Sequence, residues 1–196
     1  MKPRLVILAA GASRRLGECK ALVRFGERTV LERLLAAGHC FDSAPPIVVA
    51  GAHHAEIAGA APEGVRLLNN TNWQAGRTGS LQLARQESPG EDLCIAPVDV
   101  PLVEASVFEA LLARWRSAGA PPRGWLAPST EGRFGHPLVL GRELLEDLSG
   151  WPADRSLRLL RAEAQPLLSV EGSWPEVLDD LDSPADLARL RARNST

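Results

Sequence analysis

Short apolar segments alternate along this chain with longer segments in which apolar residues recur at helical spacing. The apolar segments are rich in branched side chains and predict buried strands over residues 4–10, 47–50, 65–68 and 93–98. Helical spacing and capping residues predict helices after Thr29, after Ala52, over residues 81–86 and over residues 104–117. This alternation predicts an α/β fold, with a mainly parallel sheet that has helices on both faces.

The ends of two helices are marked by specific residue types. Thr29, with Glu32 three positions on, has the spacing of a capping box, and Ser183 followed by Pro184 is typical of the start of a final helix. The last third of the chain is otherwise less regular, with short strands expected over 124–127, 137–140 and 167–170, and helices near Glu143 and Arg155. At 196 residues and 45% hydrophobic content, we expect one domain over residues 1–196.

Charge and cysteine content exclude several classes of protein. The net charge is −2 and the pI is about 6.1, so a surface-wide attraction for nucleic acid or membrane is not expected, and any anion site must be local. The first apolar run is interrupted by arginines after about seven residues, which is short for a signal peptide. No apolar segment approaches the roughly 18–20 residues that span a bilayer, and three cysteines cannot form a complete disulfide set. We therefore expect a cytoplasmic protein.

The candidate anion site is the segment LAAGASRRLGECK, residues 8–20, which follows the first predicted strand. In an open parallel sheet, ligands bind beyond the carboxyl ends of the strands. Gly11 and Gly17 allow backbone amides to approach an oxyanion, Ser13 adds a hydroxyl, and Arg15 and Lys20 add positive charge. This combination favours a polyphosphate ligand.

Two common phosphate-binding motifs do not match this segment. A P-loop has four residues between its glycines and a lysine directly after the second, whereas here five residues intervene and Lys20 lies three positions beyond Gly17. The dinucleotide-binding motif fails because neither Gly11 nor Gly17 has a glycine two positions away. The alternative is a flexible surface loop whose arginines serve only solubility.

LAAGASRRLGECK followed by ALVRFGERTVLERLL resembles the start of the MobA-like nucleotidyltransferase family, in which LAAG-x-S-x-R-M-G precedes a lysine and a T-x-L-E helix. The resemblance covers nearly the whole chain and implies a three-layer Rossmann-like fold and Mg²⁺-dependent transfer of a nucleotidyl group. Leu16 and Cys19 depart from the usual Met and Pro. The resemblance assigns nucleotide binding to Leu8, Ala9, Ala10, Gly11, Ser13, Arg15 and Lys20, and further along the chain to Asn70, Gly76 and Ser80.

Cleavage of a triphosphate between its α and β phosphates calls for a divalent cation, so carboxylates are expected at strand ends. Asp99 follows the predicted strand at 93–98, and Pro101 forces the residue before it into an extended conformation. This D-x-P sequence resembles the family's metal motif. Asp180 and Asp182, in LDDLDSPADL, resemble a second acidic segment near that site, although they can equally serve only the start of the last helix.

Two further segments resemble parts of the family that approach the acceptor. The segment NNTNWQAGRTGSL contains Trp73, for which core packing is an alternative, and Arg77 and Gly79 there depart from the commonest form. The acceptor residues implied by the resemblance are Trp73, Gly135, His136 and Pro137, and a core histidine is the alternative for His136. The other histidines and cysteines fit no metal spacing. The resemblance weakens over Gly150 to Leu160, which predicts an unusual acceptor end.

The resemblance implies catalysis by positioning and electrostatics, with Arg15 and Lys20 on the triphosphate and Asp99 on Mg²⁺ together with Asp180 or Asp182. The methyl group of Ala10 stands where the GTP-using relatives have a glycine, which favours CTP as the nucleotide. The resemblance further implies a molybdopterin-type acceptor and a molybdoenzyme that receives the product. Alternatives are a cytidylyl- or uridylyltransferase acting on a sugar phosphate or phospho-alcohol, and a noncatalytic molybdopterin carrier or insertion protein. The thiol of Cys19 lies among cations that would lower its pKa, and the sequence leaves open whether it is redox-sensitive or has no such role, with the second interpretation favoured.

Overall fold

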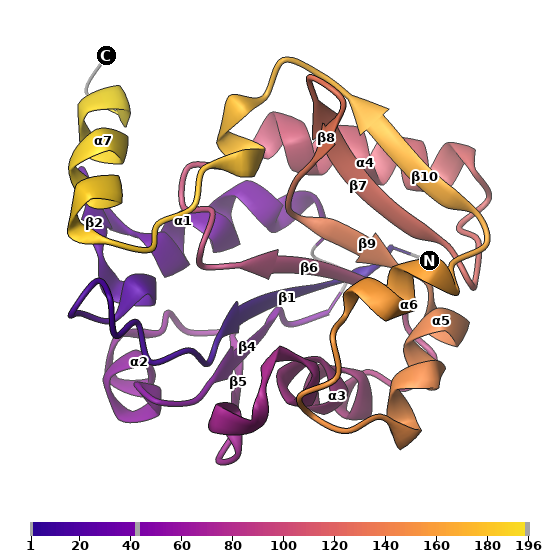
Figure 1. The fold of residues 1–196 in the computed structure, drawn as a ribbon, viewed down its shortest axis with the longest axis horizontal. Coiled ribbons are helices and arrows are strands. Elements are labelled where there is room, and N and C mark those ends of the chain that lie inside the picture. Colours follow the sequence, from indigo (N-terminus) through magenta and orange to yellow (C-terminus); the bar gives the residue numbers. More distant parts are fainter. Residues whose placement is uncertain (1, 42–43, 195–196) are drawn as a thin grey trace.

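A sheet of eight strands forms the centre of the protein in a computed structural model that describes residues 2–41 and 44–194 (Figure 1). Its strands in spatial order are β10 (Leu167–Glu171), β7 (Trp125–Thr130), β9 (Leu138–Leu140), β6 (Leu93–Pro97), β1 (Arg4–Ala9), β4 (Ile47–Ala50) and β5 (Arg66–Asn69), and β8 (Arg133–Phe134) pairs with β7. Strands β1, β4, β5 and β6 are parallel to one another, so their carboxyl ends meet at one edge. Strand β9 is antiparallel to both β6 and β7. The predicted α/β fold with a mainly parallel sheet is confirmed.

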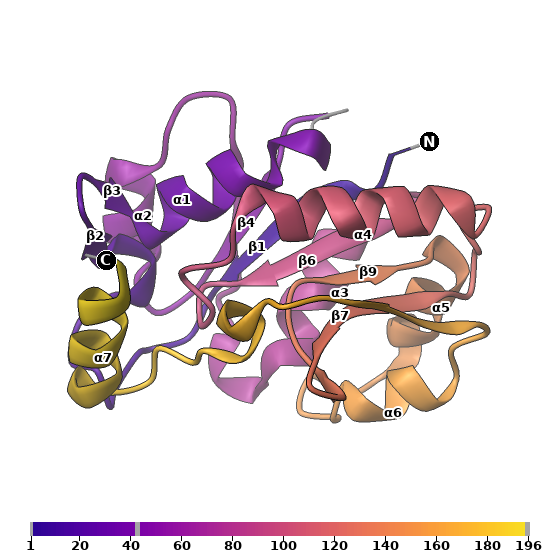
Figure 2. The ribbon, with the colours of Figure 1, turned by 90° about the horizontal axis from the view of Figure 1, so that it is seen from above.

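Helices cover both faces of the sheet (Figure 2). One face is covered by α1 (Val30–Ala37), α2 (His54–Ala60) and α4 (Ala105–Ser117), and the other by α3 (Arg77–Glu87), α5 (Arg142–Glu146) and α6 (Arg158–Ala162). The last helix, α7 (Pro184–Asn194), packs Leu187 and Leu190 on the α1 side. The described residues also form five short 3₁₀ helices: Lys20–Leu22, Gly38–Phe41, Trp73–Ala75, Asp147–Gly150 and Pro175–Leu178. None of the described helices combines the length and hydropathy needed to cross a bilayer.

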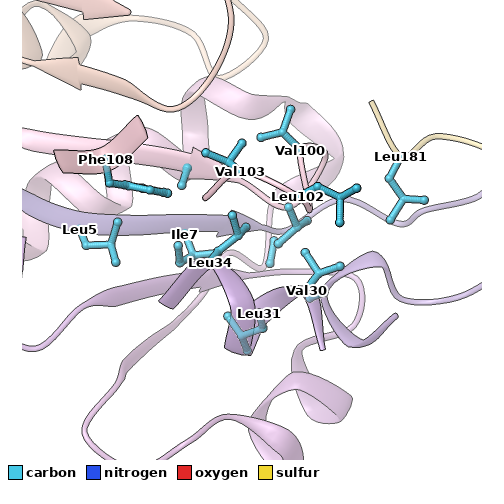
Figure 3. Packing of buried hydrophobic residues seen from close by; sticks show 14 of the residues in the cluster. Leu5, Ile7, Val30, Leu31, Leu34, Val100, Leu102, Val103, Phe108 and Leu181 are labelled. Carbon is cyan, nitrogen blue, oxygen red and sulfur yellow. The ribbon is translucent and has the colours of Figure 1, made fainter. Parts of the chain in front are cut away.

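Strand β1 is buried on both faces of the sheet. Its alternate residues Leu5 and Ile7 join the larger core beneath α1 and α4, whereas Val6 joins the core beneath α3 and α5. Figure 3 shows Leu5 and Ile7 among the aliphatic side chains of the larger core. Burying an aliphatic side chain of this size contributes about 1.5–3 kcal/mol, so the position of β1 is strongly determined. The loop that follows β1 therefore starts from a rigid point.

The predicted helix caps are present. The hydroxyl of Thr29 accepts a hydrogen bond from the Glu32 amide at 3.2 Å, and the Glu32 carboxylate accepts one from the Thr29 amide at 2.7 Å. At the start of α7, the Asp186 carboxylate accepts hydrogen bonds from the amides of Asp182 and Ser183. Hydrogen bonds from the Ser183 hydroxyl and the Arg189 guanidinium, together with these two backbone bonds, lower the pKa of Asp186 to about 2. The second cap thus fixes the backbone at Asp182.

Other elements differ from the sequence-based expectation. Helix α3 begins at Arg77 rather than at residue 81, because the Thr78 hydroxyl donates to the Arg155 carbonyl at 2.6 Å and anchors a first turn whose residues are weak helix formers. The helix expected near Arg155 begins at Arg158, since the residues before it form turns. A two-stranded hairpin, β2 (Arg24–Phe25) with β3 (Arg28–Thr29), was not expected.

Candidate active site

The loops after β1 and β6 meet at the carboxyl edge of the sheet and enclose a cavity of about 420 Å³. Strand residues Ile95, Leu138 and Leu140 form an apolar floor, on which polar groups of the loops converge. This is the edge at which an open α/β sheet binds ligands. Of the residues proposed from the sequence, the lining contains Leu8, Ala9, Ala10, Gly11, Ser13, Arg15, Lys20, Trp73, Gly76, Ser80, Asp99, His136 and Asp182.

The segment after β1 forms a loop with hydrogen bonds of its own. The amides of Leu16 and Gly17 donate to the Ser13 carbonyl at 3.0 and 2.9 Å, and Ser13 and Gly17 have φ values of 50° and 86°. The Ser13 hydroxyl accepts a hydrogen bond from the Lys20 amide at 3.3 Å. In the described part of the chain, the amides of residues 11–15 donate to no other backbone group. They are therefore available to phosphate oxygens.

Lys20 lies between two carboxylates that come from distant parts of the sequence. Its Nζ is 2.8 Å from Asp99 Oδ1 and 2.7 Å from Asp182 Oδ1, and its side chain is only 10% exposed. The hydrogen bond from Lys20 lowers the pKa of Asp182. Asp180 lies near the same charges: partial burial, with the neighbouring Asp182 and Asp99 carboxylates, raises its pKa. The geometry thus brings Asp99 and Asp182 onto one cation.

Two arginines hold the outer oxygens of the same carboxylates. Arg15 Nη2 is 2.7 Å from Asp182 Oδ2, and Arg77 Nη2 is 2.7 Å from Asp99 Oδ2. Both guanidinium groups are largely solvent-exposed, so each pair contributes little to stability. They are consequently free to exchange a carboxylate for a phosphate at low cost. Arg77 was not predicted from the sequence to be a site residue. Its position directly after Gly76, in a segment already assigned to the site, could have indicated it.

The residues present fit a divalent cation that takes part of its coordination from substrate. The Lys20 ammonium group shows that Asp99 and Asp182 oxygens can converge on a single positive charge. Within residues 2–41 and 44–194, no group of three or more His, Cys, Asp or Glu side chains is placed to hold a metal. Two carboxylates are the donor set typical of Mg²⁺ that is completed by phosphate oxygens and water.

The loop after β5 is held by an internal hydrogen bond. Asn70 is buried, outside the cavity lining, and its Nδ2 donates to Ser80 Oγ at 3.0 Å. Gly76 has a φ of 137°, and a Cβ atom there would lie 2.5 Å from the Ala153 carbonyl oxygen. Trp73, in contrast, is half-buried and lines the cavity. Asn70 therefore positions this loop from outside the cavity, whereas Trp73, Gly76 and Ser80 line the cavity.

His136 lies where the first cavity meets a second one. Burial, together with the nearby Arg77 charge, lowers the pKa of its imidazole to about 4. Its Nδ1 atom is buried and has no hydrogen-bond partner among the described residues. A Cβ atom on Gly135 would lie 2.4 Å from the Val177 carbonyl oxygen, so the backbones at Gly135 and Val177 are packed closely together. The peptide bond between His136 and Pro137 is cis. Gly135 lines the second cavity, while Pro137 and Asp180 line neither.

The expectation that nearby cations lower the pKa of the Cys19 thiol is wrong. Burial raises the pKa of its thiol and outweighs the hydrogen bonds from the Leu22 and Ala21 amides that lower it. The side chain is 7% exposed and packs in the larger core. Among the other histidines, His53 contacts Glu56 at 2.7 Å and the Ala12 carbonyl of the loop after β1 at 3.2 Å. It thus supports that loop.

Comparisons with known proteins point to one family. Residues 5–167 match the MobA-like NTP transferase domain. A molybdenum cofactor guanylyltransferase of Xanthomonas euvesicatoria pv. vesicatoria (strain 85-10) is 31% identical over 109 residues, which cover 55% of this chain and 52% of that relative. The match thus spans about half the length of the curated relative.

Two crystal structures share the fold across almost the whole chain. One is a homologue of Mycobacterium tuberculosis Rv0371c from Mycobacterium sp. strain JC1, with a TM-score of 0.78 and 25% identity over 98% of this chain and 96% of that chain. The other is Rv0371c of Mycobacterium tuberculosis H37Rv in complex with manganese, with a TM-score of 0.75 and 24% identity over 98% and 99% of the two chains. The nucleotidyltransferase fold is therefore shared.

Proposed function

The chain belongs to the MobA-like NTP transferase family and is a nucleotidyltransferase; on that premise we propose that it transfers CMP from CTP to the phosphate of a molybdopterin-type acceptor. In this reaction an oxygen of the acceptor phosphate forms a bond to the α-phosphorus of CTP. The bond from that phosphorus to the oxygen leading to the β-phosphate breaks, and pyrophosphate leaves. The observation that carries the proposal is the meeting of Lys20, Asp99 and Asp182 beneath a loop with free amides.

The loop after β1 binds the triphosphate in this proposal. Amides of residues 11–15 and the Ser13 hydroxyl surround the phosphates, and Arg15 and Lys20 neutralise them. Because these groups are already oriented, they stabilise charge that develops on the leaving pyrophosphate without further reorganisation. Lys20 moves from its two carboxylates toward the phosphates, which leaves Asp99 and Asp182 free to bind a cation.

Asp99 and Asp182 hold Mg²⁺ in this proposal, with Asp180 close enough to add negative charge. A metal held by these carboxylates would supply positive charge to offset the charge that develops on the leaving pyrophosphate. The manganese complex of Rv0371c supports a divalent ion for a protein of the same fold. The two carboxylates come from the end of β6 and the start of α7, so the fold sets their separation.

His136 contacts the acceptor in this proposal, together with Trp73 and the backbone at Gly135 and Pro137. Its lowered pKa keeps the imidazole uncharged at neutral pH, so its ring nitrogens can accept or donate one hydrogen bond each, according to the tautomer. The buried Nδ1 atom lacks a partner within the described chain, and an acceptor hydroxyl or ring N–H supplies one. The acceptor thereby orients its phosphate toward the α-phosphorus.

The preference for CTP rests on Ala10, which is 8% exposed and lines the cavity beside Ala9 and Gly11. Its methyl group narrows the region next to the free amides, which favours the smaller pyrimidine base. The relative from Xanthomonas euvesicatoria argues against this preference for CTP, because its name, molybdenum cofactor guanylyltransferase, refers to the larger guanine base. Tighter binding of GTP than of CTP in the presence of Mg²⁺ would contradict this assignment.

The decisive measurement is pyrophosphate release with each of the four NTPs, with and without molybdopterin, in the wild type and in Asp99→Ala. We expect release with CTP that needs both molybdopterin and Mg²⁺, and a loss of roughly 10²-fold or more in the variant. Release of pyrophosphate with a sugar phosphate in place of molybdopterin would instead indicate a cytidylyl- or uridylyltransferase that acts on sugar phosphates. Binding of molybdopterin with no release for any NTP indicates a carrier.

A further inference from the structure

A second cavity of about 920 Å³ opens beside the active site and has a strongly cationic wall. It shares Arg77, Trp125, His136, Leu138 and Leu157 with the first cavity, so the two are continuous. Four guanidinium groups line it, from Arg77, Arg155, Arg158 and Arg161, against the single carboxylate of Asp154. Three of these arginines come from the segment around α6, in and just beyond the region where the family resemblance weakens.

None of these three arginines is paired with a carboxylate in the described part of the chain, and two of them are oriented by aromatic rings. The Arg155 guanidinium lies 4.0 Å above the Trp151 ring, and that of Arg161 lies 4.3 Å above the Phe134 ring. Stacking on an aromatic face fixes the plane of a guanidinium group and leaves its N–H edge free for an anion. Within the described ranges, neither of these groups nor Arg158 forms an ion pair with a carboxylate.

Arg155, Arg158 and Arg161 lie apart from the residues proposed to bind the triphosphate. Arg77 stands at the junction of the two cavities and is paired with Asp99, so it belongs to the catalytic side. Arg155, Arg158 and Arg161 line only the second cavity. An acceptor that reached them with its attacking phosphate would place that phosphate away from the loop after β1.

We propose that Arg155, Arg158 and Arg161 form a subsite for a second anionic group of the acceptor, separate from the phosphate that attacks CTP. This rests on the proposed function and narrows its substrate class to acceptors that carry negative charge at two places. The dithiolene sulfurs of molybdopterin are such a second group. A sugar phosphate whose only charge is its phosphate lacks one, so the subsite discriminates against it.

The test compares R155Q/R158Q/R161Q with the wild type for binding of molybdopterin, followed by the fluorescence of its pterin. We expect the dissociation constant to rise by about 10- to 100-fold, because charge-assisted hydrogen bonds are lost, and to lose most of its dependence on KCl concentration. R155K/R158K/R161K keeps the charge and should restore part of the affinity. Arg116→Gln, on exposed α4 surface, is the matched control and should bind as the wild type does.

Arg158→Gln alone covers the case in which the triple variant does not fold, because the Arg158 side chain stacks on no aromatic ring of the described chain. Equal affinity in wild type and variants, or no binding of molybdopterin by the wild type, overturns the subsite. Pyrophosphate release in the same samples separates the two proposals. If the variants bind molybdopterin more weakly but the wild type releases no pyrophosphate, the subsite is supported and the transferase reaction is overturned. If the wild type releases pyrophosphate but all variants bind molybdopterin equally well, the transferase reaction is supported and the subsite is overturned.

Discussion

Asp182 and Asp180 are two residues apart, yet they lie differently with respect to Lys20. The carboxylate of Asp182 accepts hydrogen bonds from Lys20 and Arg15, whereas Asp180 influences the site only through its charge. We expect Asp182→Asn to lower kcat by roughly 10²-fold and Asp180→Asn by no more than about tenfold, since only the first removes a converging oxygen. Steady-state kinetics at saturating CTP measures both, with exposed Glu109→Gln on α4 as control. A larger loss in Asp180→Asn would reverse the assignment.

Lys20 occupies the position at which a metal would contact Asp99 and Asp182. Its ammonium group therefore competes with a divalent ion in the nucleotide-free protein, and CTP relieves the competition by attracting the lysine. We expect Lys20→Met to bind Mn²⁺ more tightly than the wild type without nucleotide, by about tenfold, and to bind CTP more weakly. Electron paramagnetic resonance of free Mn²⁺ measures the first effect. Lys2→Met changes the other lysine of the chain and should alter neither constant.

His136 makes stability depend on pH in a defined window. Its pKa is about 4 in the folded protein, because burial and Arg77 disfavour the imidazolium, against about 6.5 in an unfolded chain. Between these values the unfolded chain binds more protons, so the contribution is fully present above pH 6.5 and is lost as the pH falls toward 4. We expect His136→Gln to flatten the fall in free energy of unfolding between pH 6.5 and 4. Titration of His136 by NMR with a midpoint near 6.5 would refute this.

At the scale of elements, the loop before α3 packs against the segment 151–155. Gly76 takes a φ of 137° with the Ala153 carbonyl directly beside it, so Gly76→Ala introduces both backbone strain and a clash. We expect a loss of about 1–3 kcal/mol in the free energy of unfolding and weaker binding of the acceptor. Urea denaturation measures the first. Gly59→Ala in α2 is the matched control, with no atom within 4 Å of its new Cβ, and should be neutral or slightly stabilising.

The same elements show what a sequence can predict. The capping box at Thr29 and the buried strands around β1 follow from local patterns, and so were predicted within a residue or two. The ion pair of Arg77 with Asp99 joins residues 22 positions apart. It depends on the start of α3, which the Thr78 to Arg155 hydrogen bond fixes from another part of the chain. Local spacing carries no information about such a contact.

At the scale of the whole molecule, the site depends on the order of strands rather than on any one segment. Strands β4 and β6 flank β1, so the loop after β1 lies beside Asp99, and β9 enters between β6 and β7 to supply the apolar floor. Regular alternation predicted the parallel part of this sheet. The antiparallel insertion of β9 could not be predicted, because three residues of strand fit either direction equally well.

Because the site draws on β1, β6 and the start of α7, ligands that bridge them should stabilise the entire domain. CTP with Mg²⁺ at about 100 times its dissociation constant contributes about 2.7 kcal/mol, which for a chain of this length raises Tm by roughly 5–10 °C. CTP alone should give a smaller increment, since Asp99 and Asp182 then face the phosphates without a cation between them. In Asp182→Asn the increment from Mg²⁺ should shrink while that from CTP persists. Differential scanning calorimetry without acceptor measures the increase in Tm from each ligand. If Mg²⁺ raises Tm equally in the variant and in the wild type, Asp182 does not bind the metal.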